Sequence, residues 1–375
     1  MTIADDHRTH HGAPGGPAVA DGSAGSAADA ELVVPELTDG LPTEGDAATI
    51  SGLRMGGMVP DASVLPDVLP TDRLGPSGKP LPPLRAELRR THSWRNAANV
   101  VSVWLQTAGL LVVASWLTRQ LPLWAAIPIW AVVFLAMGRG LGLFAILGHE
   151  AAHRLLFSRK RVNDLVGRWL VAYPAFVPFD LYRRSHFAHH REEFGPAEPD
   201  LNLYNGYPIS RASFRRKLVR DARGSSGWKN LKSLLLAVRS EFARPVALRI
   251  LGVQLVIAVA LTAATRTWWI YPVMWLLPWM TVWRVINRLR AIAEHGGMTH
   301  SPDRRLTTHV AHQSWIARSI FVPFNTGWHL AHHVDMGIPF QNLPALHDEL
   351  VASGWVTDEI TYPSYVALWK ALASG

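Results

Sequence analysis

The side chains best able to do chemistry in this chain are histidines, and they are grouped. Three clusters supply eight of the 17 histidines: His149 and His153 (HEAAH), His186, His189 and His190 (HFAHH), and His329, His332 and His333 (HLAHH). Imidazole is the commonest metal-ligating side chain at neutral pH. Eight rings are about twice what one tetrahedral ion can use. The clusters therefore predict a site for two metal ions.

The spacing within each cluster indicates how its rings can be shared between ions. Residues four apart lie on one face of a helix, so His149 and His153 can bind the same ion. His186 and His190 also share a face, whereas the adjacent His189 projects away from it. HLAHH repeats this geometry. Each triplet can therefore ligate two ions at once.

Four apolar runs must bring these clusters together. Each is close to the length of a membrane-spanning helix, and they cover residues 99–117, 121–147, 246–264 and 268–286. Only a few polar residues separate the first run from the second and the third from the fourth, so each pair must form an antiparallel hairpin. We expect an all-α integral membrane protein with four transmembrane helices in two hairpins. A helical cap on one face carries the histidine-rich dimetal site.

The basic residues predict the orientation of these helices. The two short breaks carry one arginine each, Arg119 and Arg266, whereas the segments bearing the histidine clusters carry many Lys and Arg. Cytoplasmic loops are enriched in these residues. We therefore expect a multi-pass protein with the histidine clusters and both termini in the cytoplasm. The basic stretch 211–249 is expected to lie on the membrane surface as part of the cap.

Composition divides the chain into two parts. Residues 1–80 hold 12 acidic and 4 basic residues, are rich in Ala, Gly and Pro, and show no helical or strand period. Such composition predicts a disordered tail, followed by a membrane domain over 81–375. That domain carries 33 basic and 17 acidic residues. Its basic charge, combined with the apolar runs, favours a lipid bilayer and acidic proteins as partners and predicts no nucleic acid.

At this point the sequence resembles a known family. The chain is similar to the membrane fatty acid desaturase superfamily in the order of its three histidine motifs, HEAAH, HFAHH and HLAHH, and in its four apolar runs. The similarity extends through NTGWHLAHHVDMGIPFQNLPALH at 325–347. The triplet is specific for the superfamily and weak for the substrate. The resemblance implies a ninth histidine after the last run, and the candidate is His295 in RAIAEHGG. Some animal relatives have an asparagine four residues earlier that holds a water of the site; here this position is Ala291.

The resemblance also implies how the nine histidines divide between two iron ions. It assigns His149, His153, His186, His190 and His332 to one ion and His189, His295, His329 and His333 to the other. Ligand rings are usually oriented by hydrogen-bonding groups behind them. The candidates for this role near the clusters are Glu150, Asp200, Glu294, Asn325 and Asp335.

The function implied is an O2-dependent fatty acid desaturase, an oxidoreductase that introduces a cis double bond into a fatty acyl chain. The acyl group can be attached to a lipid, to coenzyme A or to a carrier protein. Electrons must come from outside, because the chain has no cysteine for an iron–sulfur cluster and no fused cytochrome-like module. We expect a ferredoxin-like acidic carrier and its reductase, docked on the basic body.

Three alternatives remain open at this stage. The same two-iron centre can hydroxylate or ketolate a lipid or a carotenoid. HEAAH alone also fits the zinc-protease signature H-E-x-x-H, but that reading needs one further ligand rather than six more histidines. A metal transporter or sensor would place polar residues inside the spans, and the apolar runs hold almost none apart from Arg139.

Overall fold

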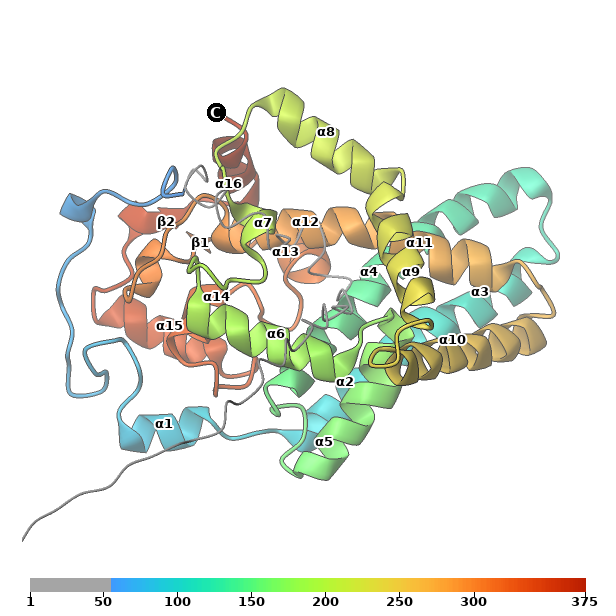
Figure 1. The fold of residues 1–375 in the computed structure, drawn as a ribbon, viewed down its shortest axis with the longest axis horizontal. Coiled ribbons are helices and arrows are strands. Elements are labelled where there is room, and N and C mark those ends of the chain that lie inside the picture. Colours follow the sequence, from blue (N-terminus) through green and yellow to red (C-terminus); the bar gives the residue numbers. More distant parts are fainter. Residues whose placement is uncertain (1–54) are drawn as a thin grey trace, which may run out of the picture. The chain divides into compact units, whose positions relative to one another are not determined.

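The long helix α4 (Leu123–Ala152) is the element against which most others pack. The computed structural model describes residues 55–375, which belong to one compact unit. Pro122 precedes α4 in an extended conformation, and Gly138 and Gly140–Ala152 are all buried. At 1.5 Å per residue a helix of this length spans about 45 Å. Its buried C-terminal half carries HEAAH into the interior (Figure 1).

Most of the described residues are helical. The α-helices are α1 (Pro82–Leu88), α2 (Ser93–Trp104), α3 (Leu110–Thr118), α4, α5 (Lys160–Val166), α6 (Phe179–Glu192), α7 (Leu201–Tyr204), α8 (Arg211–Ala222), α9 (Ser225–Ala237), α10 (Arg244–Thr265), α11 (Leu277–Met280), α12 (Val282–His295), α13 (Trp315–Ile320), α14 (His329–Val334), α15 (Leu343–Ala352) and α16 (Tyr365–Leu372). The π-helical turns are Leu105–Gly109, Gly167–Ala172 and Tyr271–Leu276. Two short strands, β1 (Val310–Ala311) and β2 (Thr361–Tyr362), pair in parallel, with Val310 opposite Thr361.

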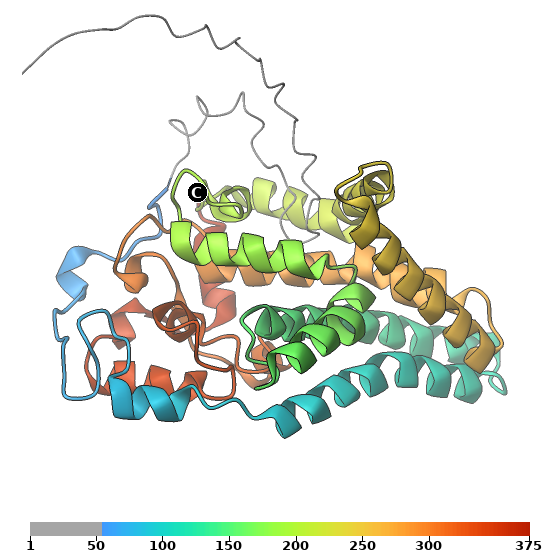
Figure 2. The same cartoon turned by 60° about the horizontal axis from the view of Figure 1, so that its bottom comes forward.

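Three segments of the described chain are long and apolar enough to cross a membrane. They are Pro82–Thr118, Leu123–Ala152 and Arg244–Thr265. The first of them contains α1, α2 and α3 and includes a non-helical link at 89–92. Helices α3, α4 and α10 run alongside one another in both views (Figures 1 and 2).

The end of α3 contacts the end of α10. The Trp116 Nε1–H donates to the carbonyl of Ala264 at 3.3 Å, and Arg119 donates to the carbonyl of Thr265. In both views this end lies opposite α14 and α15.

The fourth predicted span, 268–286, does not form one continuous helix. It is divided into the π-helical turn Tyr271–Leu276, the four-residue α11 and the start of α12. Pro272 and Pro278 remove backbone donors from this stretch. Thr281 then leaves the helical region, with φ −119° and ψ −81°. Of the four expected transmembrane helices, three are therefore found as segments long and apolar enough to cross a membrane, and the fourth is broken.

Glycines on α4 allow α12 to approach closely. A Cβ added to Gly142 would lie 2.6 Å from the Trp283 ring, and one added to Gly138 would collide with Val282. Only glycine fits between helices at this separation. The contact sets the direction of α12, which ends at His295.

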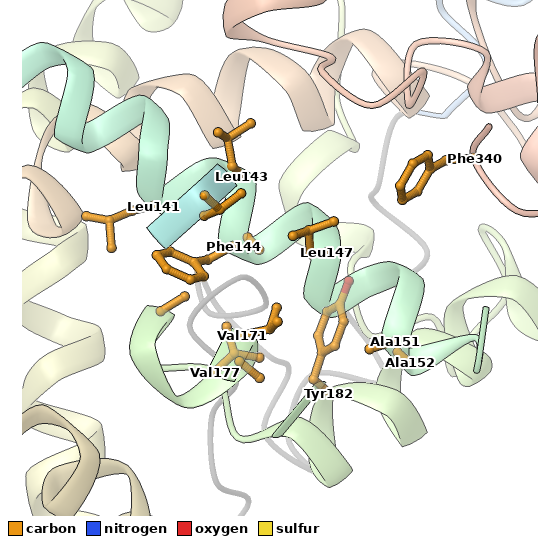
Figure 3. Packing of buried hydrophobic residues seen from close by; sticks show 14 of the residues in the cluster. Leu141, Leu143, Phe144, Leu147, Ala151, Ala152, Val171, Val177, Tyr182 and Phe340 are labelled. Carbon is orange, nitrogen blue, oxygen red and sulfur yellow. The ribbon is translucent and has the colours of Figure 1, made fainter. Parts of the chain in front are cut away.

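An apolar layer supports the end of α4. Figure 3 shows Phe144 and Leu147 of α4 above Val171 and Val177, with Tyr182 of α6 next to Ala151. Phe144, Leu147 and Val171 are fully buried. Large buried side chains at native density resist displacement, so this layer fixes the segment that carries His149.

The tail predicted for residues 1–80 falls mostly on residues 1–54, which lie outside the described residues. Residues 55–80 contact the helical body at several points. Leu74 is buried, and Arg73 forms an ion pair with Glu349 of α15, with Nη2 2.7 Å from Oε1. Where the tail ends, and the domain boundary at residue 80, stay predictions.

Candidate metal centre

Four helices deliver the nine candidate histidines to one place. His149 lies in the last turn of α4 and His153 caps that helix. The other seven lie on α6, α12 and α14: His186, His189 and His190, then His295, then His329, His332 and His333. Eight of the nine are buried, and His153 is half-buried. Segments more than 30 residues apart in the sequence therefore converge on one interior site.

Five of these rings form a first group. Ligand-capable nitrogens of His149, His153, His186, His190 and His332 all lie within 4.8 Å of one another. The Nε2 atom of His186 lies 2.7 Å from that of His153 and 3.1 Å from that of His190. His149 Nε2 is buried and has no hydrogen-bond partner among the described residues. The five rings point their nitrogens at a common centre.

The remaining four rings form a second group. Nitrogens of His189, His295 and His333 lie within 4.8 Å of one another. His329 joins them, because its Nε2 lies 3.0 Å from the Nε2 atoms of both His295 and His333. The two groups coincide with the two ligand sets that the family resemblance implies.

In each ring of the second group, Nδ1 is the nitrogen that faces away from the other rings, and it lies close to an oxygen atom. His189 Nδ1 lies 3.0 Å from the Glu198 carboxylate, and His295 Nδ1 lies 2.8 Å from the carbonyl of Thr307. The two remaining contacts join His333 Nδ1 to Glu193, and His329 Nδ1 to Glu294 at 3.5 Å. A proton held on Nδ1 leaves Nε2 with a lone pair for a metal. The acceptors hydrogen-bonded to Nδ1 of His189, His295 and His333 therefore favour the orientation in which Nε2 of these rings faces inward.

Burial keeps most of these rings neutral. It lowers the pKa of His153 to about 3 and holds the pKa values of His186 and His332 far below their ordinary range. His189 is the exception. Burial lowers its pKa, but the charge and hydrogen bond of Glu198 outweigh that effect and raise the pKa to about 9. Neutral imidazole is the form that ligates metals.

The arrangement fits a pair of transition-metal ions. A neutral imidazole carries one N–H, so nitrogens facing one another in groups of five and four cannot all be satisfied by hydrogen bonds among themselves. A cation at each centre satisfies all of them, including the orphaned Nε2 of His149. A donor set of imidazole nitrogens suits iron, zinc, copper or nickel. The residues present therefore fit a di-iron site.

The five outer residues expected from the sequence occupy different places. Glu294 lies beside His329, and Asp200 forms a group with His189 and Glu198. The remaining three have other partners. Glu150 accepts a hydrogen bond from the Phe340 N–H, Asp335 forms an ion pair with Arg89, and the carbonyl of Asn325 accepts from the Trp328 N–H.

Two carboxylates at the site were not expected from the sequence. Glu193 and Glu198 are buried, and each holds a ring of the second group. Glu193 also pairs with Arg304, whose Nη1 lies 2.5 Å from Oε2. A sequence signal existed, because both follow HFAHH within eight residues in REEFGPAEPD.

In the described part of the chain, two cavities have histidines of both groups in their walls. A small one of 70 Å³ touches both groups and is lined by Tyr182, Leu203, Asn287, Ala291 and other residues of α6 and α12. A larger one of 640 Å³ has ligand candidates from both groups in its wall. Its lining includes His153, His190, His333, Lys79, Arg89, Arg191 and Arg304.

Comparison with known proteins agrees with this geometry. Residues 122–365 match the sequence model of the family described as fatty acid desaturase. The sn-1 oleoyl-lipid 12-desaturase of Picosynechococcus is 26% identical over 323 residues, which cover 76% of this chain and 84% of that protein. The chloroplastic omega-6 fatty acid desaturase of Brassica napus is 24% identical over 349 residues, covering 85% and 71%. The dihydrorhizobitoxine desaturase of Bradyrhizobium elkanii is 26% identical over 234 residues, covering 58% and 65%.

Proposed function

Because the chain belongs to the fatty acid desaturase family, we propose that its nine clustered histidines hold two iron ions and that it desaturates an acyl chain of a membrane lipid. Family membership makes the protein an oxidoreductase that acts on a fatty acyl substrate. The observation that carries the metal proposal is the convergence of nine ring nitrogens in two groups. The choice of a lipid-bound acyl chain is supported by the oleoyl-lipid desaturases among its relatives.

The proposed ligands follow the two groups. His149, His153, His186, His190 and His332 would hold one ion, and His189, His295, His329 and His333 the other. When bound, the iron pair would supply the activation of O2 that removes one hydrogen from each of two adjacent methylenes. Reducing O2 to two waters while these two hydrogens are taken from the chain needs two further electrons and two protons.

The protein's own residues position this chemistry. Glu198, Glu193 and the carbonyl of Thr307 hold three of the second-group rings in one orientation. Buried carboxylates behind a ring also raise its strength as a ligand. We propose the same orienting role for Glu294 and, through its group with His189, for Asp200.

The small cavity is the proposed place of the reacting carbons. It touches His149 and His186 of the first group and His189, His295 and His329 of the second. Placing both methylenes there would bring them next to both ions, and fixed placement of a substrate lowers its barrier. Ala291 lines this cavity, so its small side chain leaves room that asparagine would fill.

We further propose that four spans cross the membrane in two hairpins and that the histidine groups and both termini face the cytoplasm. Trp116 and Arg119 contact the end of α10, which supports placing the turn after α3 and the turn after α10 on the same side of the membrane. The broken run 268–286 would serve as the fourth span, because Trp275 and Trp279 bury its π-helical turn and α11 against neighbouring helices. Residues 81–375 would form the membrane domain, and residues 55–80 pack on it through the buried Leu74 and the ion pair of Arg73 with Glu349.

Electrons would enter through the 640 Å³ cavity. Its wall contains His153 and His190 of the first group and His333 of the second, so a carrier docked there would lie next to proposed ligands of both ions. Lys79 and Arg191 are exposed at this cavity. Cationic rims attract acidic partners and raise their association rate. We propose that an acidic ferredoxin-like carrier docks here.

Lipid analysis tests the proposed function. The chain is expressed with a ferredoxin and its reductase in a host of known acyl composition, and the acyl chains are analysed by gas chromatography and mass spectrometry. New double bonds should appear with the wild type and with His312→Ala and vanish with His332→Ala. Hydroxylated acyl chains instead would favour a hydroxylase, which is the alternative that the same metal centre permits. An unchanged profile from protein that contains two irons would overturn acyl desaturation.

A further inference from the structure

The segment 211–249, called here the basic belt, concentrates positive charge on the surface. It contains α8, α9 and the first residues of α10. Ten of its basic residues are exposed: Arg211, Arg215, Arg216, Arg220, Arg223, Lys229, Lys232, Arg239, Arg244 and Arg249. Within this fully described segment only Glu241 is an exposed carboxylate, since Asp221 is buried against Arg288. The belt therefore presents a strongly cationic surface.

Large apolar side chains are exposed among these cations. Phe242 is 69% exposed and Trp228 is 55% exposed, and Leu235, Leu236 and Leu248 are each about half exposed. Cations interleaved with tryptophan, phenylalanine and leucine are typical of helices that lie in the interface of a membrane. A surface that faces only water does not need this apolar component.

The position of the belt is also that of a membrane interface. Its last part, from Arg244 onward, is the beginning of α10, a segment long and apolar enough to span a membrane. The first turn of α9 packs on the end of α11, where a Cβ added to Gly227 would collide with Met280. The belt therefore includes the beginning of α10 and packs on the end of α11, where the proposed spans would pass from hydrocarbon to lipid headgroups.

We propose that the basic belt binds the headgroups of anionic phospholipids in the membrane that holds the protein. Clusters of four to eight Lys and Arg next to a membrane span bind anionic lipids through their surface potential. An acidic electron carrier is the other partner that positive charge could attract. The belt suits it less well, because the belt residues are absent from the lining of the 640 Å³ cavity that reaches the histidines.

Spin-labelled lipids measure this preference directly. The whole chain is reconstituted in phosphatidylcholine bilayers that contain traces of spin-labelled phosphatidylglycerol or phosphatidylcholine. Electron paramagnetic resonance then gives the fraction of each label held at the protein surface. We expect phosphatidylglycerol to associate about fivefold more strongly than phosphatidylcholine, and we expect added salt to reduce the difference. Equal association of the two lipids with the wild type would overturn the proposal.

Matched variants locate the effect. Arg215→Gln/Arg216→Gln/Lys229→Gln removes three exposed charges from the belt, and Arg159→Gln/Lys160→Gln/Arg161→Gln removes three exposed charges at the start of α5. The belt variant should lose most of the preference for phosphatidylglycerol, and the α5 variant should keep it. Equal losses in the two variants would contradict a specific belt. Unchanged lipid preference with weaker binding of an acidic ferredoxin would show that the belt is a protein-docking surface.

A charge-conserving variant separates charge from misfolding. Arg215→Lys/Arg216→Lys keeps both cations and should retain the preference, whereas a loss would contradict recognition by charge. These measurements record lipid binding and not desaturation. Failure of the lipid proposal therefore leaves the proposed enzyme function untouched, and the reverse also holds.

Discussion

Glu198 holds His189 from behind, with the carboxylate 3.0 Å from Nδ1 and both side chains buried. The hydroxyl of Tyr204 lies 3.1 Å from the same nitrogen. Because Nδ1 is occupied, the opposite nitrogen of His189 is the one available to the group formed with His295 and His333. A carboxylate eight residues beyond HFAHH thus determines how one of its histidines can act.

Replacing this carboxylate should weaken the second metal position selectively. Glu198→Gln keeps the shape of the side chain but removes its charge, and such losses behind a ligand cost about 10- to 100-fold in metal affinity. Iron content measured against increasing chelator should fall from two per chain to one before the second ion is lost. The exposed Glu87→Gln should behave as the wild type. Joint loss of both ions, or no change, would contradict an orienting role confined to the second group.

A methyl group on Gly142 should separate α4 from α12. Its Cβ would lie 2.6 Å from the Trp283 ring, so Gly142→Ala overpacks the contact and should destabilise the protein by about 1–3 kcal/mol. The control is Gly252→Ala on α10, where nothing lies within 4 Å of the added Cβ. Thermal unfolding in detergent measures both. A Gly142→Ala protein as stable as Gly252→Ala would contradict the close helix contact.

Filling the small cavity should stop the reaction without removing the metal. Ala291→Leu places a larger side chain in the 70 Å³ cavity that touches both histidine groups. Misplacement of a substrate by about 1 Å costs on the order of 100-fold in rate. We expect turnover to fall by at least that factor with iron content unchanged, and Ala291→Gly to remain active. Full activity of Ala291→Leu would show that the reacting carbons lie elsewhere.

Reversing the charge of residues at the 640 Å³ cavity should weaken the binding of the electron carrier. Lys79→Glu/Arg191→Glu should raise the KM for an acidic ferredoxin about tenfold at low salt, since charged rims govern encounter. The difference from the wild type should shrink as salt increases. Arg215→Glu/Arg216→Glu in the basic belt is the matched control and should leave this KM unchanged. The opposite pattern would move the docking site to the belt.

Which histidines share a face within one cluster could be predicted because it depends on local geometry, whereas the division into groups of five and four was implied only by the family resemblance. Residues three and four apart on a helix keep fixed relations, so the shared face of His186 and His190 follows from spacing alone. His295 differs, since no neighbouring histidine marks it and only the family resemblance separated it from other isolated histidines. Its place beside His329, with the two Nε2 atoms 3.0 Å apart, results from the packing of α12 on α4.

Other features depended on contacts that the sequence does not display. Glu193 and Glu198 reach the rings because the chain turns back after α6, and hydropathy carries no sign of that turn. Hydropathy also measures composition and not continuity. It therefore indicated a fourth apolar run but could not show that Thr281 interrupts it. Likewise, the Arg73–Glu349 contact joins residues 276 positions apart, and the acidic composition of the tail could not predict it.

The most direct test of the account is the metal content of the purified chain grown with iron-57. Elemental analysis should find two irons per chain, and Mössbauer spectra should show two iron environments. His332→Ala in the first group and His295→Ala in the second should each reduce the count, whereas His312→Ala should retain two. One zinc per chain and no iron, or two irons retained in both histidine variants, would contradict the proposed two-iron centre.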